Sequence, residues 1–294
     1  IPQSFDDFFR GLKYLLWIAK GMMDNLGKKK VGTALTIIPP VIFLIAVGPP
    51  AVLLGMVLMA TFLGLREFYA LCLPHSFQIE RWAGIGLGLI FSLMVLFGNP
   101  KMGSLFLVFL LFFLSLLFMM TSKDLSSTIS NLGISLFGIF YVGFLLSHVS
   151  LVRYGVNGRI WVLFMIATVW AGDISAYWIG SLLGRHRLYP KISPKKTYEG
   201  LGGAIGGSVL TALVFSKIFL PELKTAFTLF LAIGMGILGQ AGDFIESMLK
   251  RSAQVKDSGS FIPGHGGMLD RLDSFLFSAP FLHYSLLYLL KGTP

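Results

Sequence analysis

One dense polar stretch, residues 250–273, interrupts an otherwise apolar chain and reads KRSAQVKDSGSFIPGHGGMLDRLD. Gly264, Gly266 and Gly267 surround His265, and glycine lets backbone N–H groups approach a phosphate closely. Positive charge for phosphate oxygens and carboxylates for Mg²⁺ flank this turn. Its charged residues are Lys250, Arg251, Lys256, Asp257, Asp270, Arg271 and Asp273. The stretch is therefore typical of metal-assisted chemistry on a polyphosphate.

Simpler roles exist for single residues of this stretch. Asp270 and Asp273 are one helical step apart before Phe275, so they also fit a helix N-terminus that needs capping. His265 also fits a hydrogen-bonded loop residue. Neither role explains why both charge signs cluster here.

A row of polar residues precedes the stretch. Asp243, Glu246, Ser247 and Lys250 follow one another at i, i+3, i+4 and i+7, which places them on one helix face. A polar row in an apolar helix needs an aqueous or ionic environment, although a structural face remains an alternative. Asp173 is a further carboxylate in an apolar segment, where it fits either a polar cavity or a hydrogen bond across the helix bundle.

A second basic connection, residues 184–200, reads GRHRLYPKISPKKTYEG. Its candidate binding residues are Ser193, Lys195, Lys196, Thr197 and Glu199. Its two prolines predict a shaped loop. The alternative is the ordinary basic charge of a cytoplasmic loop, bound to anionic headgroups.

The composition indicates a membrane protein. Hydrophobic residues make up 55% of the 294 residues and the mean hydropathy is +0.77, so a soluble domain of this size is excluded. The net charge of +10 fits the basic cytoplasmic loops of such proteins better than nucleic-acid binding. A single cysteine, Cys72, excludes an internal disulfide framework and a cysteine metal cluster.

We predict an all-α integral membrane protein with one catalytic domain over residues 31–294. We expect an amphipathic helix in residues 1–30 that lies in the membrane interface, the alternative being a helix packed on another protein helix. About nine transmembrane helices follow, at residues 31–48, 51–71, 84–98, 103–120, 131–151, 160–182, 201–220, 226–249 and 275–290. The basic residues are most numerous in alternate loops, which predicts a cytoplasmic N-terminus. The connections 183–200 and 250–274 then share the cytoplasmic side.

Residues 247–273 resemble the signature of the phosphatidate cytidylyltransferase family. The matching positions are Ser247, Lys250, Arg251, Lys256, Asp257, Gly259, Pro263, His265, Gly266, Gly267, Asp270, Arg271 and Asp273. Ser193–Thr197 with Glu199 and Gly200, and Asp173 with Ala176 and Tyr177, are also similar to the family. The resemblance spans roughly residues 165–275, and the first half of the chain shares only its apolar, multi-span character.

The resemblance implies that CTP and phosphatidic acid give CDP-diacylglycerol and pyrophosphate with Mg²⁺, a second cation being left open. It implies Asp243 and Asp270 as metal ligands, and basic residues of both connections as phosphate ligands. His265, Gly266 and Gly267 would shape the phosphate turn. The remaining carboxylates would be ligands or orient basic side chains: Asp173, Glu199, Asp257 and Asp273. It further implies a homodimer, and a bacterial inner membrane with a cytoplasmic active site.

Two other functions compete with this one. A CTP-dependent lipid kinase is a similar basic, multi-span enzyme, but it would release CDP in place of pyrophosphate. A transporter would use Asp173 and Asp243 as an intramembrane ion site, but it leaves residues 250–273 without a role. The sequence contains no Walker phosphate loop, GxSxG elbow or HExxH zinc helix.

Overall fold

The computed structural model describes residues 28–290 except 75, 123 and 260–265. Its helices are α2 (Lys28–Val47), α3 (Pro50–Cys72), α4 (Gln78–Phe97), α5 (Pro100–Thr121), α6 (Leu125–Gly138), α7 (Leu145–Tyr154), α8 (Gly158–Leu183), α9 (Tyr198–Phe219), α10 (Thr225–Ser252) and α11 (Leu269–Ser285). A π-helical turn, Ile139–Phe144, joins α6 to α7, and another, Leu286–Leu290, extends α11. The strands β1 (Arg187–Tyr189) and β2 (Ser193–Thr197) pair antiparallel between α8 and α9.

The chain is an all-α integral membrane protein, as predicted. Each predicted membrane segment coincides with a helix of the described part, where α6 and α7 together form one span. Within that part, seven helical segments are both long and apolar enough to cross a membrane. The predicted amphipathic helix of residues 1–30 lies almost entirely outside the described residues, so it stays a prediction.

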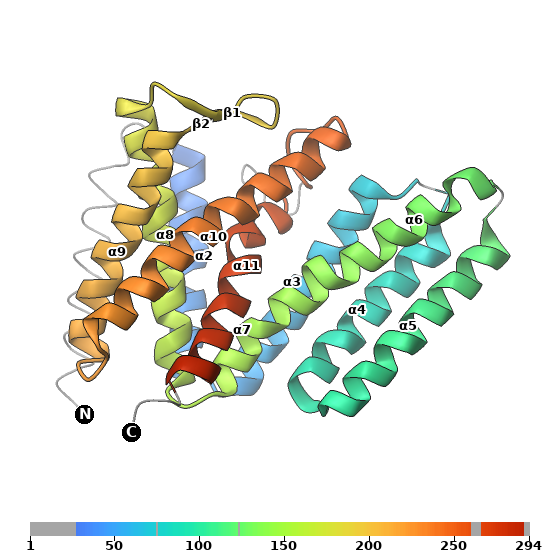
Figure 1. Ribbon diagram of the computed structural model, residues 1–294, viewed down its shortest axis with the longest axis horizontal. Coiled ribbons are helices and arrows are strands. Elements are labelled where there is room, and N and C mark those ends of the chain that lie inside the picture. Colours follow the sequence, from blue (N-terminus) through green and yellow to red (C-terminus); the bar gives the residue numbers. More distant parts are fainter. Residues whose placement is uncertain (1–27, 75, 123, 260–265, 291–294) are drawn as a thin grey trace.

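Prolines and caps set where several helices begin. Pro50 occupies the first turn of α3 after Pro49, which gives the tight connection expected from Gly48-Pro49-Pro50. Asn99 caps α5 with its side chain, which accepts a hydrogen bond from the Met102 N–H at 2.9 Å. These short connections keep α2 to α5 as successive antiparallel neighbours along the chain (Figure 1).

Small residues bring α8 and α9 close together. A Cβ at Gly172 would collide with Ser208 of α9, and one at Gly203 would collide with Ile179 of α8. The Ser208 hydroxyl also donates to the Thr168 carbonyl at 3.1 Å. Close approach through small residues is the usual packing of membrane helices. This pair forms one wall of the site.

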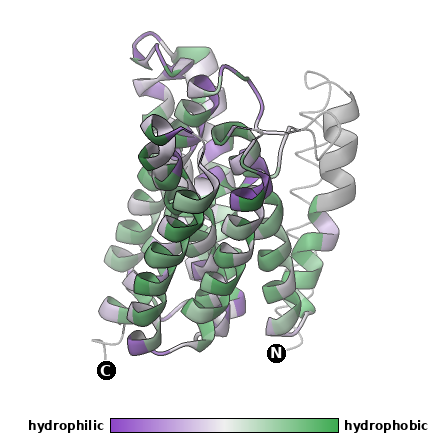
Figure 2. Ribbon diagram, turned by 90° about the vertical axis from the view of Figure 1, so that its right-hand side faces the viewer, coloured by the Kyte–Doolittle hydropathy of each residue, from purple (hydrophilic) through white to green (hydrophobic). Residues whose placement is uncertain are grey.

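Polar residues gather at one end of the bundle, where the hairpin β1–β2 lies, whereas the helix shafts are mainly hydrophobic (Figure 2). The C-terminal end of α10 reaches the same end of the molecule (Figure 1). The Arg251 Nε donates to the Ile192 carbonyl of the hairpin at 3.3 Å. The two long polar connections therefore meet on one side, as the charge pattern predicts.

Candidate active site

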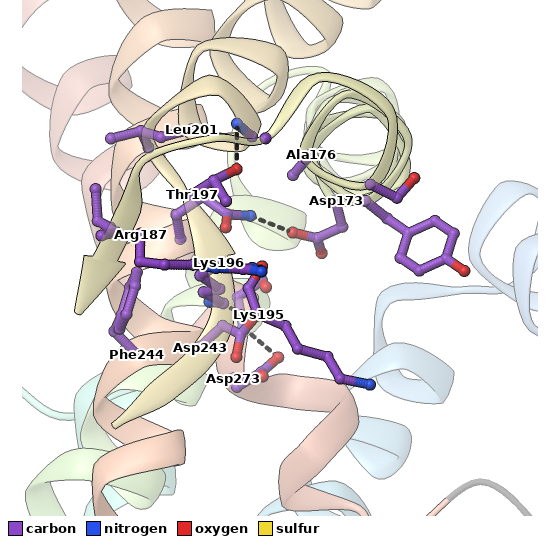
Figure 3. Close-up of a pocket in the computed structure, with 18 of the residues that line it drawn as sticks. Asp173, Ala176, Arg187, Lys195, Lys196, Thr197, Leu201, Asp243, Phe244 and Asp273 are labelled. Atoms are coloured by element: carbon purple, nitrogen blue, oxygen red, sulfur yellow. Dashed lines mark hydrogen bonds and ion pairs between the residues drawn. The ribbon is translucent and has the colours of Figure 1, made fainter. Parts of the chain in front are cut away.

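A cavity of about 620 Å³ opens at this polar end between α8, the hairpin, α9, α10 and the start of α11. It collects residues from both polar connections and from the membrane helices between them. The predicted site residues that line it are Asp173, Lys195, Lys196, Thr197, Asp243, Asp270 and Asp273. Figure 3 shows Asp173, Lys196, Asp243 and Asp273 converging from four separate elements. The fold thus joins the two halves of the predicted site.

Three carboxylates form a compact acidic cluster, and two of them, Asp243 and Asp273, line this cavity. Asp243 and Glu246 of α10 and Asp273 of α11 each offer an oxygen, and these oxygens lie within 4.8 Å of one another. Glu246 is fully buried. Its Oε2 meets the Lys250 ammonium, and its Oε1 has no hydrogen-bond partner among the described residues. So many acidic oxygens in a partly buried site repel one another unless a cation lies between them or one of the carboxyl groups is protonated.

Lys196 supplies positive charge to this cluster from the hairpin. Its Nζ lies 2.6 Å from Asp243 Oδ2 and 4.2 Å from the centre of the Phe244 ring. A lysine held by a carboxylate and an aromatic face is oriented as well as charged. The register of β2 sets this geometry, because Lys196 is half-buried while Lys195 is exposed. Lys196 therefore occupies a position that a bound cation could share or take over.

Asp173 lies across the cavity from the cluster. Its Oδ1 accepts a hydrogen bond from Gln240 Nε2 at 2.9 Å, which links α8 to α10. Both expectations for this residue are met in part: it bonds across the bundle, with glutamine as its partner, and it faces a polar cavity. Asp173 is thus placed to orient Gln240 or to bind a ligand.

Asp270 has a different environment although it also borders the cavity. Its Oδ1 pairs with Lys250 Nζ at 2.6 Å. Its Oδ2 accepts from the Gly267 N–H at 2.8 Å, the Ser258 N–H at 3.0 Å and the Ser258 hydroxyl at 2.9 Å. Lys250 bridges this carboxylate to Glu246. Asp270 therefore holds the signature loop together and, in this arrangement, has little free capacity for a further ligand.

The glycine turn of the signature binds the protein's own carboxylate. Gly266 has a φ of +79°, which only glycine adopts without strain, and a Cβ there would crowd Asp270 Oδ2. The turn aims the Gly267 N–H at Asp270. The expected contact of this N–H with a phosphate stays a prediction, and His265 lies outside the described residues.

Several other predicted residues make structural contacts. The Thr197 hydroxyl accepts from the Gly200 N–H at 3.0 Å and so caps α9. Glu199 pairs with His186 at 2.7 Å, and Ser247 donates to Asp243 at 3.3 Å. Arg251 also donates to the Val255 carbonyl. The predicted residues that lie outside the cavity lining are Ser193, Glu199, Ser247, Lys250, Arg251, Lys256, Asp257, Gly266, Gly267 and Arg271.

Sequence reasoning missed three residues. Glu246 was expected on the polar face of α10 but not as a member of the acidic cluster. Gln240 continues that face one turn earlier and could have been found by the same spacing. Glu67 of α3 bonds the signature loop through Ser258, Met268 and Leu269. Its signal was a carboxylate near the end of an apolar helix.

The residues fit a bound divalent cation. Mg²⁺ is held by carboxylate oxygens, and the cluster of Asp243, Glu246 and Asp273 presents them at one point. The buried and unpartnered Glu246 Oε1 is an oxygen that such an ion would satisfy. The cluster contains Asp243 but replaces Asp270 with Asp273 and Glu246, so the predicted pair of metal ligands stays a prediction.

The fold and this cavity define a polytopic membrane protein with a polar, carboxylate-rich site at one end. A family model described as "Cytidylyltransferase family" matches residues 28–289, and the chain belongs to this family. The membership confirms the resemblance drawn from the signature residues.

Curated relatives are similar over long stretches. A phosphatidate cytidylyltransferase of Synechocystis is 34% identical over 78% of this chain and 86% of its own length. One of Bacillus subtilis is 36% identical over 54% of this chain and 60% of its own length. An uncharacterized protein of Escherichia coli, YnbB, is 33% identical over 82% of this chain and 81% of its own length.

Proposed function

We propose that this protein transfers a cytidylyl group from CTP to phosphatidic acid, which yields CDP-diacylglycerol and pyrophosphate. The observation that carries the proposal is the cavity in which Asp243, Asp273 and Lys196 converge at the polar end of apolar helices. Such a site can receive a water-soluble nucleotide from one side and a lipid headgroup from the membrane. The names of the Synechocystis and Bacillus relatives support the same reaction.

The reaction is a displacement at phosphorus. A phosphate oxygen of phosphatidic acid attacks the α-phosphorus of CTP, the bond to the bridging oxygen of the β-phosphate breaks, and pyrophosphate leaves. The attacking phosphate is already anionic near neutral pH, so neither a strong base nor a covalent protein intermediate is needed. The protein must bring two anions together in line and neutralise their charge.

Separate groups of the cavity suit these two tasks. Lys196, with exposed Lys195 beside it, offers positive charge to the phosphates on the hairpin side. The cluster of Asp243, Glu246 and Asp273 would hold Mg²⁺, which when bound supplies charge neutralisation between the phosphates. Asp173 of α8 and Gln240 of α10 are joined by a hydrogen bond and orient each other. Whether a second cation binds stays open.

The cellular setting is part of the proposal. We place the polar end and its cavity in the cytoplasm of a bacterium, with the protein in the inner membrane, because basic residues favour the cytoplasmic side. CTP would then reach the site directly. A homodimer is also proposed from the family resemblance. Labelling of a cysteine introduced into the hairpin of a Cys72→Ser variant, in sealed spheroplasts, tests the orientation, since a cytoplasmic hairpin reacts only after lysis.

The decisive test is a product assay with purified protein. We expect Mg²⁺-dependent release of pyrophosphate from CTP only when phosphatidic acid is present. Release of CDP with a phosphorylated lipid would indicate a CTP-dependent lipid kinase instead. Ion flux in vesicles without nucleotide turnover would indicate a transporter. Either of these outcomes contradicts the proposed function.

A further inference from the structure

Glu67 connects the first half of the chain to the signature loop. It lies on α3, 201 residues before Met268, and its Oε1 accepts from the Met268 N–H at 2.9 Å. Its Oε2 accepts from the Leu269 N–H at 2.9 Å and from the Ser258 hydroxyl at 3.1 Å. One carboxylate therefore binds both ends of the segment between residues 258 and 269.

These bonds cap helix α11. Its first residue is Leu269, and the residue before it, Met268, supplies no side-chain cap. The first N–H groups of a helix have no partner within it and carry partial positive charge. Glu67 satisfies two N–H groups at this end from another helix. It takes the capping role that the sequence suggested for Asp270 and Asp273.

Two glycines of the signature fit closely around this carboxylate. A Cβ at Gly259 would lie 2.6 Å from Glu67 Oε1, and a Cβ at Gly267 would collide with Glu67 Oε2. Any larger residue at either position would push the carboxylate away. The small residues of the signature are therefore matched to Glu67 as well as to Asp270.

Ser258 links Glu67 to Asp270. Its buried hydroxyl lies 3.1 Å from Glu67 Oε2 and 2.9 Å from Asp270 Oδ2. A hydroxyl has one proton, so the two carboxylates share or exchange this donor. Asp270 in turn holds Lys250 at the edge of the acidic cluster. The charge and position of Glu67 thus bear on Asp270 and on the start of α11, which carries Asp273.

We propose that Glu67 is a positioning residue of the cytidylyltransferase site, a role that rests on the function proposed above. It acts through Ser258 and the first turn of α11, by fixing where Asp270 and Asp273 face the cavity. A residue that orients a ligand in this way typically contributes roughly 10–100-fold to activity.

The test compares Glu67→Gln, Glu67→Asp and Ser258→Ala with the wild-type full-length protein in detergent. Glu67→Gln keeps the size but loses the charge and one acceptor oxygen, while Glu67→Asp keeps the charge. Asp124→Asn is the matched control, because Asp124 caps α6 through the Ser126 N–H at 3.0 Å and lies outside the site. Each variant is assayed for kcat, for KM of CTP and phosphatidic acid, and for amide hydrogen exchange.

We expect Glu67→Gln to lower kcat by roughly 10–100-fold, with a smaller change in either KM. Glu67→Asp should restore part of this loss. Exchange should rise at Met268 and Leu269 in Glu67→Gln. In Asp124→Asn exchange at Ser126 should stay near that of wild type, because asparagine caps a helix as well as aspartate does, and kcat should stay within about twofold of wild type. The fold-loss of kcat in the double variant Glu67→Gln/Ser258→Ala should be smaller than the product of the two single fold-losses, since the two residues share one hydrogen bond.

Two results separate the possible failures. A folded wild-type protein without phosphatidate-dependent turnover overturns the proposed function and this role with it. Wild-type turnover that Glu67→Gln retains, or losses that multiply independently with Ser258→Ala, overturns the role of Glu67 alone. Size-exclusion elution at the wild-type volume ensures that each comparison is made on folded protein.

Discussion

Asp243 and Asp270 are both predicted as metal ligands from the sequence but lie in contrasting surroundings. Asp243 faces the cavity with Lys196 at 2.6 Å and the Ser247 hydroxyl at 3.3 Å. Asp270 is bound by Lys250 on one oxygen and by Ser258 and Gly267 on the other. Asp243 contributes an oxygen to the acidic cluster with Glu246 and Asp273. The oxygens of Asp270 instead accept hydrogen bonds from donors of the protein.

The difference shows that a signature can combine two tasks. Carboxylates with few donors keep oxygens free for a cation or for the cationic side chains that hold phosphates. A carboxylate surrounded by N–H and O–H donors defines the shape of a loop. In this chain we propose the first task for the acidic cluster and the second for Asp270 with Glu67. Mutations at the two places should therefore affect activity and stability in different proportions.

Asp243→Asn should have the largest effect on activity. The change removes one negative oxygen from the cluster and the partner of Lys196, so we expect kcat to fall by roughly 100-fold or more. The free energy of unfolding should change by less than about 1 kcal/mol, because the lost attraction to Lys196 is offset by weaker repulsion from Asp273. Pyrophosphate release and thermal unfolding measure the two quantities. Near-normal turnover would remove Asp243 from the site.

Asp270→Asn should reduce both activity and stability. Asparagine cannot neutralise Lys250, and its amide group places a donor where the carboxylate accepted hydrogen bonds. Loss of a largely buried ion pair costs about 3–5 kcal/mol, so a clear fall in the melting temperature is expected. We expect kcat to fall by roughly 10–100-fold. If Asp270→Asn were as stable as Asp243→Asn, the two carboxylates would have equivalent roles, and the proposed difference between them would be wrong.

The membrane helices, the polar face of α10 and the meeting of the two polar connections could all be predicted from the sequence. Hydropathy locates the membrane helices because each must present about 20 apolar residues to the bilayer. The i, i+3, i+4, i+7 spacing places Asp243 and Glu246 on one face because a helix repeats every 3.6 residues. The basic charge pattern brings the hairpin and the signature together at one end.

Contacts between segments that are distant in the sequence cannot be predicted from such spacing or charge patterns. Glu67 reaches Ser258 and Leu269 through the packing of α3 near α11, and no local pattern specifies that pairing. The position of Asp273 in the acidic cluster depends on where α11 begins, which Glu67 helps to determine. The partners of Asp270 likewise depend on the loop conformation around Gly266. Residue types could therefore be predicted, but their division into binding and holding roles required coordinates.

Lys196→Gln should have an intermediate effect on activity, and it tests the role of the acidic cluster in the cavity. Lys196 competes with a bound cation for Asp243, so its removal should lower the Mg²⁺ concentration for half-maximal activity by up to about fivefold, equivalent to roughly 1 kcal/mol. Loss of its charge for the phosphates should at the same time reduce kcat by roughly tenfold or more. Mg²⁺ titrations of initial rates separate the two effects. A higher Mg²⁺ requirement would show that Lys196 assists cation binding.

Glu199→Gln should have the smallest effect, and it tests whether signature-like residues outside the cavity contribute. Glu199 pairs with His186, an exposed residue, and neither lines the cavity. An exposed pair of this kind contributes little, so stability and kcat should stay close to wild type, within about twofold for kcat. His186→Gln is the matched control, because it breaks the same pair from the other side. A loss of roughly tenfold in Glu199→Gln but not in His186→Gln would mean that Glu199 leaves His186 to contact a substrate. The site would then extend beyond the cavity along the first turn of α9.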